Sequence, residues 1–243
     1  MIRILLITLA MLTSLHRANA QQTTNFDALM YKYQLVDIQT IDKDILVKLK
    51  YSTEDNFVGI DMYGDLEHAY LEKGFADRVA KAQNILKSRN SNYTLLIYDA
   101  ARPISVQRAM HKCVKGTDLE RFVANGTRGG RHNYGVAVDL TIATLDGTPL
   151  DMGAKFDDFT DAASVKGTPD SSDASTRTLS VYRAYINNMA ARGVISYEAA
   201  KNRILLIEVM LEAGLYPYRR EWWHFEEIIS MDSVRNSYKL LDF

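Results

Sequence analysis

The 243-residue chain has little cysteine, almost no net charge and few long apolar runs. Its one cysteine, Cys113, excludes an intramolecular disulfide, and we expect it to be buried in a helix as a small apolar side chain. A formal net charge of −1 gives no overall field for nucleic acid or an anionic membrane, so neither is expected as a partner. The composition, 47% apolar and 24% charged, is that of one large globular domain without repeats.

The first twenty residues differ from the rest of the chain. Arg3 gives a positive start, an almost unbroken apolar run follows over 4–15, and Ala18 and Ala20 are the small residues that a signal peptidase reads. The run is short for a membrane span, and no later segment is long and apolar enough for one. We therefore predict a signal peptide over residues 1–20, one mature domain over residues 21–243, and export to the periplasm. A helix in the core or an uncleaved anchor is the alternative.

Hydrophobic periodicity predicts both helices and strands. Apolar residues at helical spacing favour helices over 75–87, 104–115, 176–191 and 196–212. Alternating or short apolar runs favour strands over 45–51, 94–98, 136–142 and within 215–229. The polar segment 144–169 indicates a long loop, and such loops are usually functional. Because helices and strands do not alternate strictly, we predict an α+β fold: a single domain with a mostly antiparallel central sheet flanked by helices.

A histidine and a carboxylate flank the predicted strand that ends at Asp139. In one continuous strand His132 and Asp139, seven residues apart, would face opposite sides of the sheet. Gly135 and the turn before it can break this register and bring the two side chains together. Alone the segment is weak evidence for a metal, because a surface histidine and an unrelated aspartate would give the same pattern.

A second histidine follows two tryptophans. Glu221 and His224 lie among Trp222, Trp223 and Phe225, where a charged group would be poorly solvated unless it were paired or bound to metal. In a regular strand Glu221 and His224 would point apart, but a turn or bulge at Trp222 would let both reach one site. A core histidine with a surface glutamate explains this segment equally well.

Together the two segments supply two imidazoles and one carboxylate. Three protein ligands leave a fourth position for water, which is the pattern of a catalytic zinc site, and we predict one Zn²⁺ per chain. Its ligands would be His132, Asp139 and His224. Glu221 is placed to take a proton from the activated water and pass it to a leaving amine. Arg102, held between a buried strand and a proline, offers rigid donors to an oxyanion, although it could instead form a salt bridge with Asp99.

These residues resemble the zinc D-alanyl-D-alanine dipeptidases, which are related to zinc D,D-carboxypeptidases and hedgehog-like domains. The resemblance is carried by Asp-Ala-Ala-Arg-Pro at 99–103, His132-(x6)-Asp139-Leu-Thr and Glu-Trp-Trp-His at 221–224, and it extends over about 35–227. It implies the same three zinc ligands, Glu221 as the general base and Arg102 as the group that stabilises the tetrahedral intermediate.

The resemblance also implies two substrate-binding residues. Tyr51 matches a substrate-contacting tyrosine, and Asp157 matches an aspartate that faces the free amine of the substrate. A carboxylate can hold an ammonium group, and this clamp would limit the substrate to a dipeptide. One position departs from the family: a serine usually stands two residues before the first zinc histidine, and here that residue is Gly130.

The leading hypothesis is a zinc-dependent hydrolase that cleaves D-alanyl-D-alanine, or a close D,D-dipeptide, in peptidoglycan metabolism. One alternative is a D,D-carboxypeptidase or endopeptidase acting on peptidoglycan stem peptides, which has no use for an amine clamp at Asp157. Another is a non-catalytic zinc or cell-wall binding module, against which Glu221 argues because a structural metal needs no base. No feature of the sequence indicates an oligomeric state.

Overall fold

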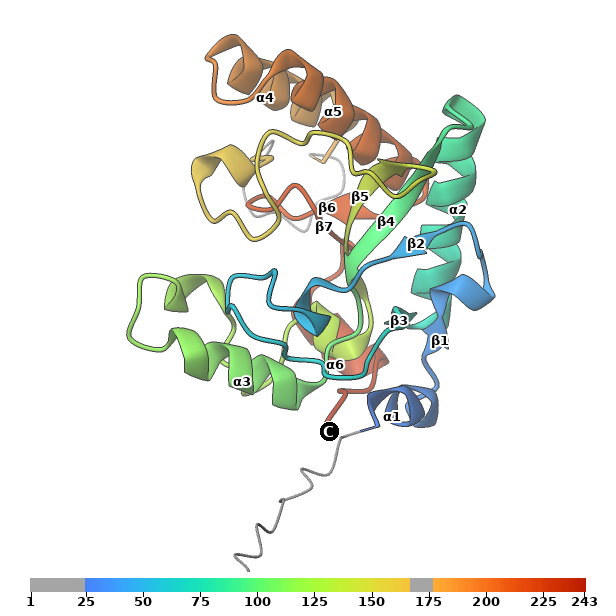
Figure 1. Ribbon diagram of the computed structural model, residues 1–243, viewed down its shortest axis with the longest axis vertical. Coiled ribbons are helices and arrows are strands. Elements are labelled where there is room, and N and C mark those ends of the chain that lie inside the picture. Colours follow the sequence, from blue (N-terminus) through green and yellow to red (C-terminus); the bar gives the residue numbers. More distant parts are fainter. Residues whose placement is uncertain (1–24, 167–176) are drawn as a thin grey trace, which may run out of the picture.

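The central feature of the fold is a five-stranded sheet with strand order β2-β4-β5-β7-β6. The computed structural model describes residues 25–166 and 177–243, so the predicted signal peptide lies outside the described residues. The strands are β2 (Leu46–Val47), β4 (Tyr93–Asp99), β5 (Ala137–Thr144), β6 (Tyr216–Pro217) and β7 (His224–Glu226). Only β2 and β4 are parallel, and the other three pairs are antiparallel. The predicted α+β fold with a mostly antiparallel sheet is confirmed (Figure 1).

The register of the three middle strands aligns polar residues at one end of the sheet. Asp99, the last residue of β4, lies opposite Asp139 of β5, and Asp139 lies opposite His224 of β7. The apolar part of β4, rich in leucine and isoleucine, is buried beneath the helices and fixes this register, since a slip by one residue would reverse every side chain. The sheet therefore brings residues that are far apart in the sequence together at one end of its middle strands.

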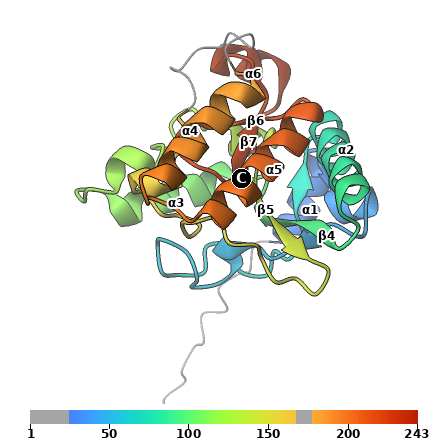
Figure 2. The same ribbon diagram turned by 90° about the horizontal axis from the view of Figure 1, so that it is seen from above.

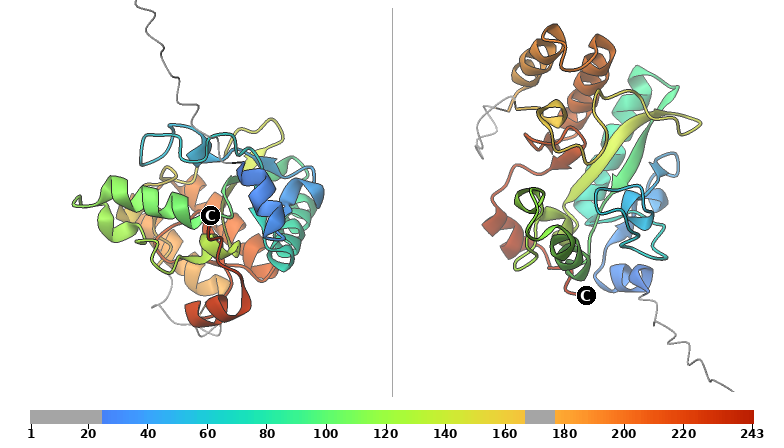
Figure 3. Two further views of the ribbon diagram at one scale, coloured as in Figure 1. Left: turned by 90° about the horizontal axis from the view of Figure 1, so that it is seen from below. Right: turned by 60° about the vertical axis from the view of Figure 1, so that its left-hand side comes forward.

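Helices cover the sheet. They are α1 (Phe26–Lys32), α2 (Lys73–Arg89), α3 (Ile104–Val114), α4 (Leu179–Ala191), α5 (Tyr197–Glu212) and α6 (Met231–Ser237). Helix α2 packs against β4 and α5, α5 packs against β5 and β6, and α4 lies on α5 (Figure 2). Helices α4 and α5 lie towards one end of the long strands, and α1, α3 and α6 towards the other (Figures 1 and 3).

The ends of α5 follow the sequence closely. The Ser196 hydroxyl accepts a hydrogen bond from the Ala199 N–H at 2.9 Å, and Gly214 follows the helix in a left-handed conformation at φ +84°. The strand predicted over 45–51 is shorter than expected. Only β2 pairs there, because 50–52 turn into a 3-10 helix that buries Tyr51.

The long loop after β5 is fastened to the body of the protein by buried side chains. The guanidinium of Arg203, on α5, donates to the carbonyl oxygens of Met152, Ala162 and Ser164. The Trp222 indole N–H donates to the Ala154 carbonyl at 3.2 Å. These bonds satisfy backbone acceptors that would otherwise be buried without partners, so the described part of the loop has a defined path.

The C-terminal segment is also part of the body. The Leu241 N–H donates to the Asn133 carbonyl and the Leu241 carbonyl accepts from the Ile104 N–H, both at 2.9 Å, so the segment joins the start of α3 to the turn that carries His132. The prediction that Cys113 is buried is wrong: it is exposed in the last turn of α3, where Val114 is the buried residue. Among the described residues no helix is long and apolar enough to cross a membrane.

Candidate metal centre and active site

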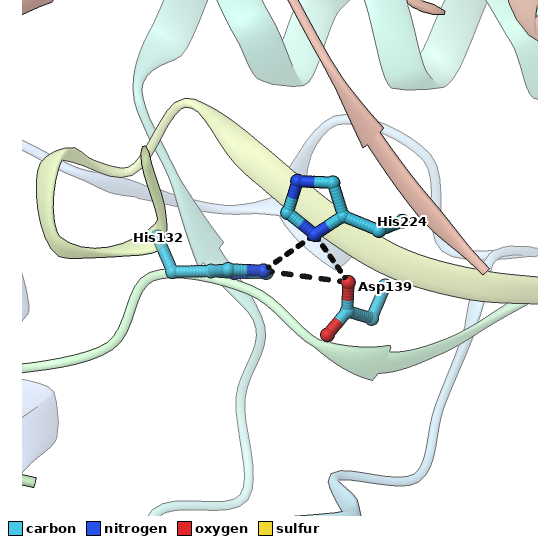
Figure 4. Close-up of side chains that lie close together, drawn as sticks. All are labelled: His132, Asp139 and His224. Atoms are coloured by element: carbon cyan, nitrogen blue, oxygen red, sulfur yellow. Dashed lines mark hydrogen bonds and ion pairs between the residues drawn. The ribbon is translucent and has the colours of Figure 1, made fainter. Parts of the chain in front are cut away.

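Three side chains converge at the edge of the sheet (Figure 4). The Asp139 Oδ1 lies 2.9 Å from the His224 Nδ1 and 3.3 Å from the His132 Nε2, and the two nitrogens are 3.1 Å apart. The triangle is nearly equilateral. Ligands 2.0–2.2 Å from a tetrahedral zinc would be separated by about 3.3–3.6 Å. The donor atoms therefore fit around one small cation with shifts of a few tenths of an ångström.

Two breaks in the strands produce this convergence. His132 lies in a 3-10 helix, Arg131–Tyr134, which Gly135 ends at φ +70°. A Cβ on this glycine would lie 2.9 Å from the Leu35 side chain and 3.1 Å from the Glu72 N, so the turn requires glycine. On the other side of the site, Trp222 and Trp223 form a turn between Glu221 and β7. Both breaks occur where the sequence indicated them.

The outer nitrogen of each imidazole has a partner. The His132 Nδ1–H donates to the Ala100 carbonyl oxygen at 2.7 Å. The His224 Nε2 lies 3.3 Å from the Glu226 Oε2, and the Arg131 Nε lies 2.8 Å from that same oxygen. Histidines that bind metal usually have such partners, which leave the inner nitrogen free for the ion.

The surroundings of the three side chains favour positive charge. Burial opposes ionisation of Asp139, yet His132 and His224 hold its pKa well below the ordinary value. Burial would lower the pKa of His224, but hydrogen bonds and charges from Asp139 and Glu226 raise it to about 10. A buried imidazole that favours a proton so strongly lies in the negative field that a divalent cation requires.

Glu221 lies beside this centre. Its Oε2 is 3.9 Å from the His224 Nδ1, and burial together with Asp139 raises its pKa to about 7 against the opposing charge of His224. A carboxylate with a pKa near the working pH can both accept and return a proton. Glu221 therefore has the position and the chemistry of a general base.

Arg102 forms the salt bridge with Asp99 that the sequence left open, and it also lines the cavity in front of the three side chains. Its guanidinium bonds Asp99 through Nε and Nη2 and the Gln107 side chain through Nη1, and it also interacts with the Tyr63 hydroxyl. Burial would lower its pKa, but Asp99 raises it above the ordinary value, so the charge is permanent. Anchoring and oxyanion stabilisation are therefore compatible for this side chain.

Tyr51 and Asp157 meet at another wall of the same cavity. The Tyr51 hydroxyl lies 3.1 and 3.2 Å from the two Asp157 carboxylate oxygens, and the Phe57 N–H donates to Oδ2 at 3.3 Å. Asp157 is held at φ +60°, a left-handed conformation that costs energy in most residues. Burial and the nearby charge of Asp139 raise its pKa to about 8.

The cavity that joins these groups has a volume of about 530 Å³. All seven predicted site residues line it, and so does Gly130. A Cβ added to Gly130 would meet no atom within 4 Å, so no other side chain fills the space where the family usually has a serine. The stacked rings of Phe122 and Phe159, 4.9 Å apart, close one side.

Three ligand-type side chains and a half-buried glutamate that line one cavity have the architecture of a hydrolytic metalloenzyme. The sequence profile of the family described as D-ala-D-ala dipeptidase matches residues 31–188 and 183–239. A D-alanyl-D-alanine dipeptidase of Escherichia coli is 30% identical over 193 residues, 79% of this chain and 84% of the relative. One of Synechocystis is 25% identical over 200 residues, covering 70% and 73%. The chain belongs to this family of metal-dependent peptidases.

The sequence did not single out Glu226, Arg131 or the Phe57 N–H, all of which contact predicted site residues. Glu226 carried a usable signal, because it stands two residues after His224, where a strand places both side chains on one face. The contact of the Phe57 N–H with Asp157 depends on the paths of two loops, and no local pattern indicates it.

Proposed function

We propose that this protein is a zinc-dependent D-alanyl-D-alanine dipeptidase that works in the periplasm, where it hydrolyses free D,D-dipeptides from peptidoglycan metabolism. The observation that carries the proposal is the union, in one cavity, of the near-equilateral triangle of donor atoms with Glu221 and Asp157. The periplasmic location rests on the signal peptide predicted from the sequence.

In this proposal one zinc ion is held by His132, Asp139 and His224. When bound, zinc supplies Lewis-acid chemistry, since it polarises a carbonyl and lowers the pKa of a bound water to about 7. The donor set supports this choice of metal, because imidazole and carboxylate in a three-ligand arrangement are typical of catalytic zinc sites.

Glu221 and Arg102 carry the reaction on the protein side. Glu221 takes a proton from the attacking water and delivers it to the nitrogen of the leaving D-alanine, so it ends the cycle ionised again. Arg102 would direct a guanidinium N–H at the carbonyl oxygen that becomes negative. Because Asp99 and Gln107 already hold the guanidinium, little reorganisation is needed when this charge develops.

Asp157 and Tyr51 define the length of the substrate. The Asp157 carboxylate would pair with the free ammonium of the dipeptide, and the Tyr51 hydroxyl would fix the orientation of that carboxylate. A longer peptide has an amide nitrogen at this position, with no charge to offset the burial of Asp157. The wall therefore favours a dipeptidase over an enzyme that trims stem peptides.

The test compares D-Ala-D-Ala with N-acetyl-D-Ala-D-Ala, using zinc-loaded protein and measuring released D-alanine. We expect a preference for the free dipeptide of about 10–150-fold, the value of one buried charged hydrogen bond. Equal or faster cleavage of the acetylated form would support the carboxypeptidase alternative and contradict the dipeptidase assignment.

A variant of the base separates catalysis from binding. Glu221→Gln should keep one zinc per chain and lose about 10²–10⁴-fold in kcat, the range of general acid–base catalysis. Zinc content is measured on the same sample. A wild type that binds zinc but cleaves no D,D-peptide would instead favour a non-catalytic zinc module.

A further inference from the structure

We propose that Glu226 is a positioning residue of the metal centre: its carboxylate, held by Arg131, fixes the orientation and the tautomer of the His224 ring. The inference rests on the proposed metal site and adds a residue that acts through a ligand without touching the ion. It is carried by contacts at the outer nitrogen of the His224 ring, on the side away from Asp139 and His132, where Arg131 and Glu226 also line the cavity.

The two nitrogens of His224 face different partners. Nδ1 points into the triangle of donor atoms, whereas Nε2 lies 3.3 Å from the Glu226 Oε2. A neutral imidazole has one N–H and one lone pair. When the Nε2–H is donated to Glu226, the lone pair is on Nδ1 and points at the metal position. The opposite tautomer would direct a hydrogen at the ion and a lone pair at a carboxylate.

The position of Glu226 follows from strand geometry. Residues two apart in a strand lie on one face, so Glu226 accompanies His224 on β7. In the sheet register it is aligned with Ala137 of β5 on one side and Tyr216 of β6 on the other. Only 12% of its side chain is exposed, and a buried carboxylate is costly unless it is paired. Arg131 and His224 are polar partners of this carboxylate, and the charge of Arg177 also favours its ionised form, which accounts for a charge in the middle of a sheet.

Arg131 anchors this carboxylate from the other half of the site. Its Nε lies 2.8 Å from the Glu226 Oε2, its Nη2 donates to the Ile229 carbonyl, and it directly precedes His132 in the chain. The same 3-10 helix thus supplies one metal ligand and holds the partner of another. The two imidazoles are connected by a route that passes through Glu226 and does not require the ion.

The second imidazole is fixed differently, which explains why Glu226 matters for only one of them. The His132 Nδ1–H donates to the backbone carbonyl of Ala100, an acceptor that no side-chain substitution removes. His224 depends on a side chain. A carboxylate acceptor also makes the imidazole a more basic ligand, and loss of such a partner typically weakens metal affinity by about 10–100-fold.

The neighbouring residue provides a matched control. Glu227 is as well buried as Glu226, with 9% of the residue exposed. It pairs with Arg78 and accepts from the Tyr238 hydroxyl at 3.2 Å, and no contact joins it to His224 in the part of the chain that the structure describes. Glu227→Gln therefore neutralises a comparable buried carboxylate while leaving the metal centre intact.

The experiment measures zinc affinity by competition with a chromophoric chelator for the wild type, Glu226→Leu, Glu226→Gln and Glu227→Gln. The visible absorption of the Co²⁺-substituted proteins reports ligand geometry, and far-UV circular dichroism reports folding. We expect Glu226→Leu to bind zinc about 10–100-fold more weakly and to alter the cobalt spectrum. Glu226→Gln, whose amide oxygen still accepts the Nε2–H but carries no charge, should recover only part of the affinity and bind zinc measurably more weakly than the wild type. Glu227→Gln should match the wild type in both measurements.

The proposal is overturned if Glu226→Leu binds zinc within twofold of the wild type. It is also overturned if Glu227→Gln weakens zinc binding as much as Glu226→Leu does. Should the leucine variant fail to fold, the two glutamine variants decide: we expect weaker zinc binding only in Glu226→Gln, and equal affinities contradict the proposal. The titration uses no substrate. A Glu226-dependent zinc site without D-Ala-D-Ala hydrolysis would overturn the proposed function alone, and hydrolysis with Glu226-independent zinc binding would overturn this inference alone.

Discussion

The metal-binding part of the cavity and its amine-binding part are built in different ways. Asp139 and His224 lie opposite each other on paired strands, and each imidazole is held at its outer nitrogen. Asp157 lies on a long loop at φ +60°, and its carboxylate accepts from one hydroxyl and one backbone N–H. The first part is fixed by the register of the sheet. The second depends on a strained residue that distant side chains support.

Because of this difference, the metal-binding part can carry the hydrolytic chemistry while the amine-binding part sets substrate specificity. The fold stabilises the metal-binding part, whereas the buried carboxylate of Asp157, with its pKa raised to about 8, opposes folding once it is ionised. Strained and destabilising groups are typical of ligand-binding sites, where favourable contacts form only when the ligand binds. Substitutions at Asp157 should therefore alter substrate choice while the metal site remains.

Among substitutions outside the metal ligands and Glu221, the largest effect is expected from Asp157→Asn. Asparagine tolerates the left-handed conformation but has no charge for the substrate ammonium. We expect kcat/KM for D-Ala-D-Ala to fall about 100-fold, the loss of one charged hydrogen bond, while the rate for N-acetyl-D-Ala-D-Ala stays within about threefold. Steady-state kinetics on both substrates measure the change. An equal loss on the two substrates would show that Asp157 supports the whole cavity rather than the amine.

The same variant should be more stable than the wild type at alkaline pH. The folded pKa of Asp157, about 8, lies above the unfolded value near 3.9, so the folded protein holds a proton that the unfolded chain releases. The wild type accordingly loses stability as pH rises from about 4 to about 8, and Asp157→Asn does not undergo this titration. We expect the variant to gain at least about 1 kcal/mol relative to the wild type between pH 5 and pH 9.

Thermal unfolding in a chelating buffer, at both pH values, measures this gain. The chelator keeps a bound cation from lowering the pKa of Asp157. A stability difference that is the same at pH 5 and pH 9 would contradict the assignment of a raised pKa to this carboxyl.

The smallest effect is expected from Gly130→Ser, which restores the hydroxyl usual in the family. The position has φ −101° and open space where a Cβ would lie, so the substitution introduces neither strain nor a clash. We expect unchanged zinc affinity and a change in KM of no more than about tenfold, the effect of one exposed hydrogen bond. A loss of zinc would mean that Gly130 shapes the turn of His132.

Much of the metal-binding part could be predicted from the sequence. His132 and Asp139 flank an apolar run, and the glycine at position 135 indicates the first break. The break at Trp222 follows because Glu221 and His224, three residues apart, would face opposite sides of a regular strand. The antiparallel sheet followed from the irregular order of helices and strands, and the family resemblance named Tyr51 and Asp157.

The remainder depends on tertiary structure. The predicted strand over 45–51 forms only at Leu46–Val47, and its end turns into a 3-10 helix because Tyr51 packs into the core, which overrides local β-propensity. The pKa of Asp157 is raised by burial that only the folded loop creates. Arg203 holds that loop from 39 to 51 residues away in the sequence. Cys113 was placed wrongly because helical spacing does not show which turns of a helix extend beyond the core.

Zinc content in two aspartate variants shows whether the metal-binding and amine-binding parts of the cavity are separate. Wild type, Asp139→Asn and Asp157→Asn are dialysed against equal free zinc, and metal per chain is measured by elemental analysis together with D-Ala-D-Ala hydrolysis. We expect one zinc per chain in the wild type and in Asp157→Asn, strongly reduced zinc in Asp139→Asn, and impaired hydrolysis in both variants. Full zinc occupancy and activity in Asp139→Asn, or loss of zinc in Asp157→Asn, would contradict a site made of separate metal-binding and amine-binding parts.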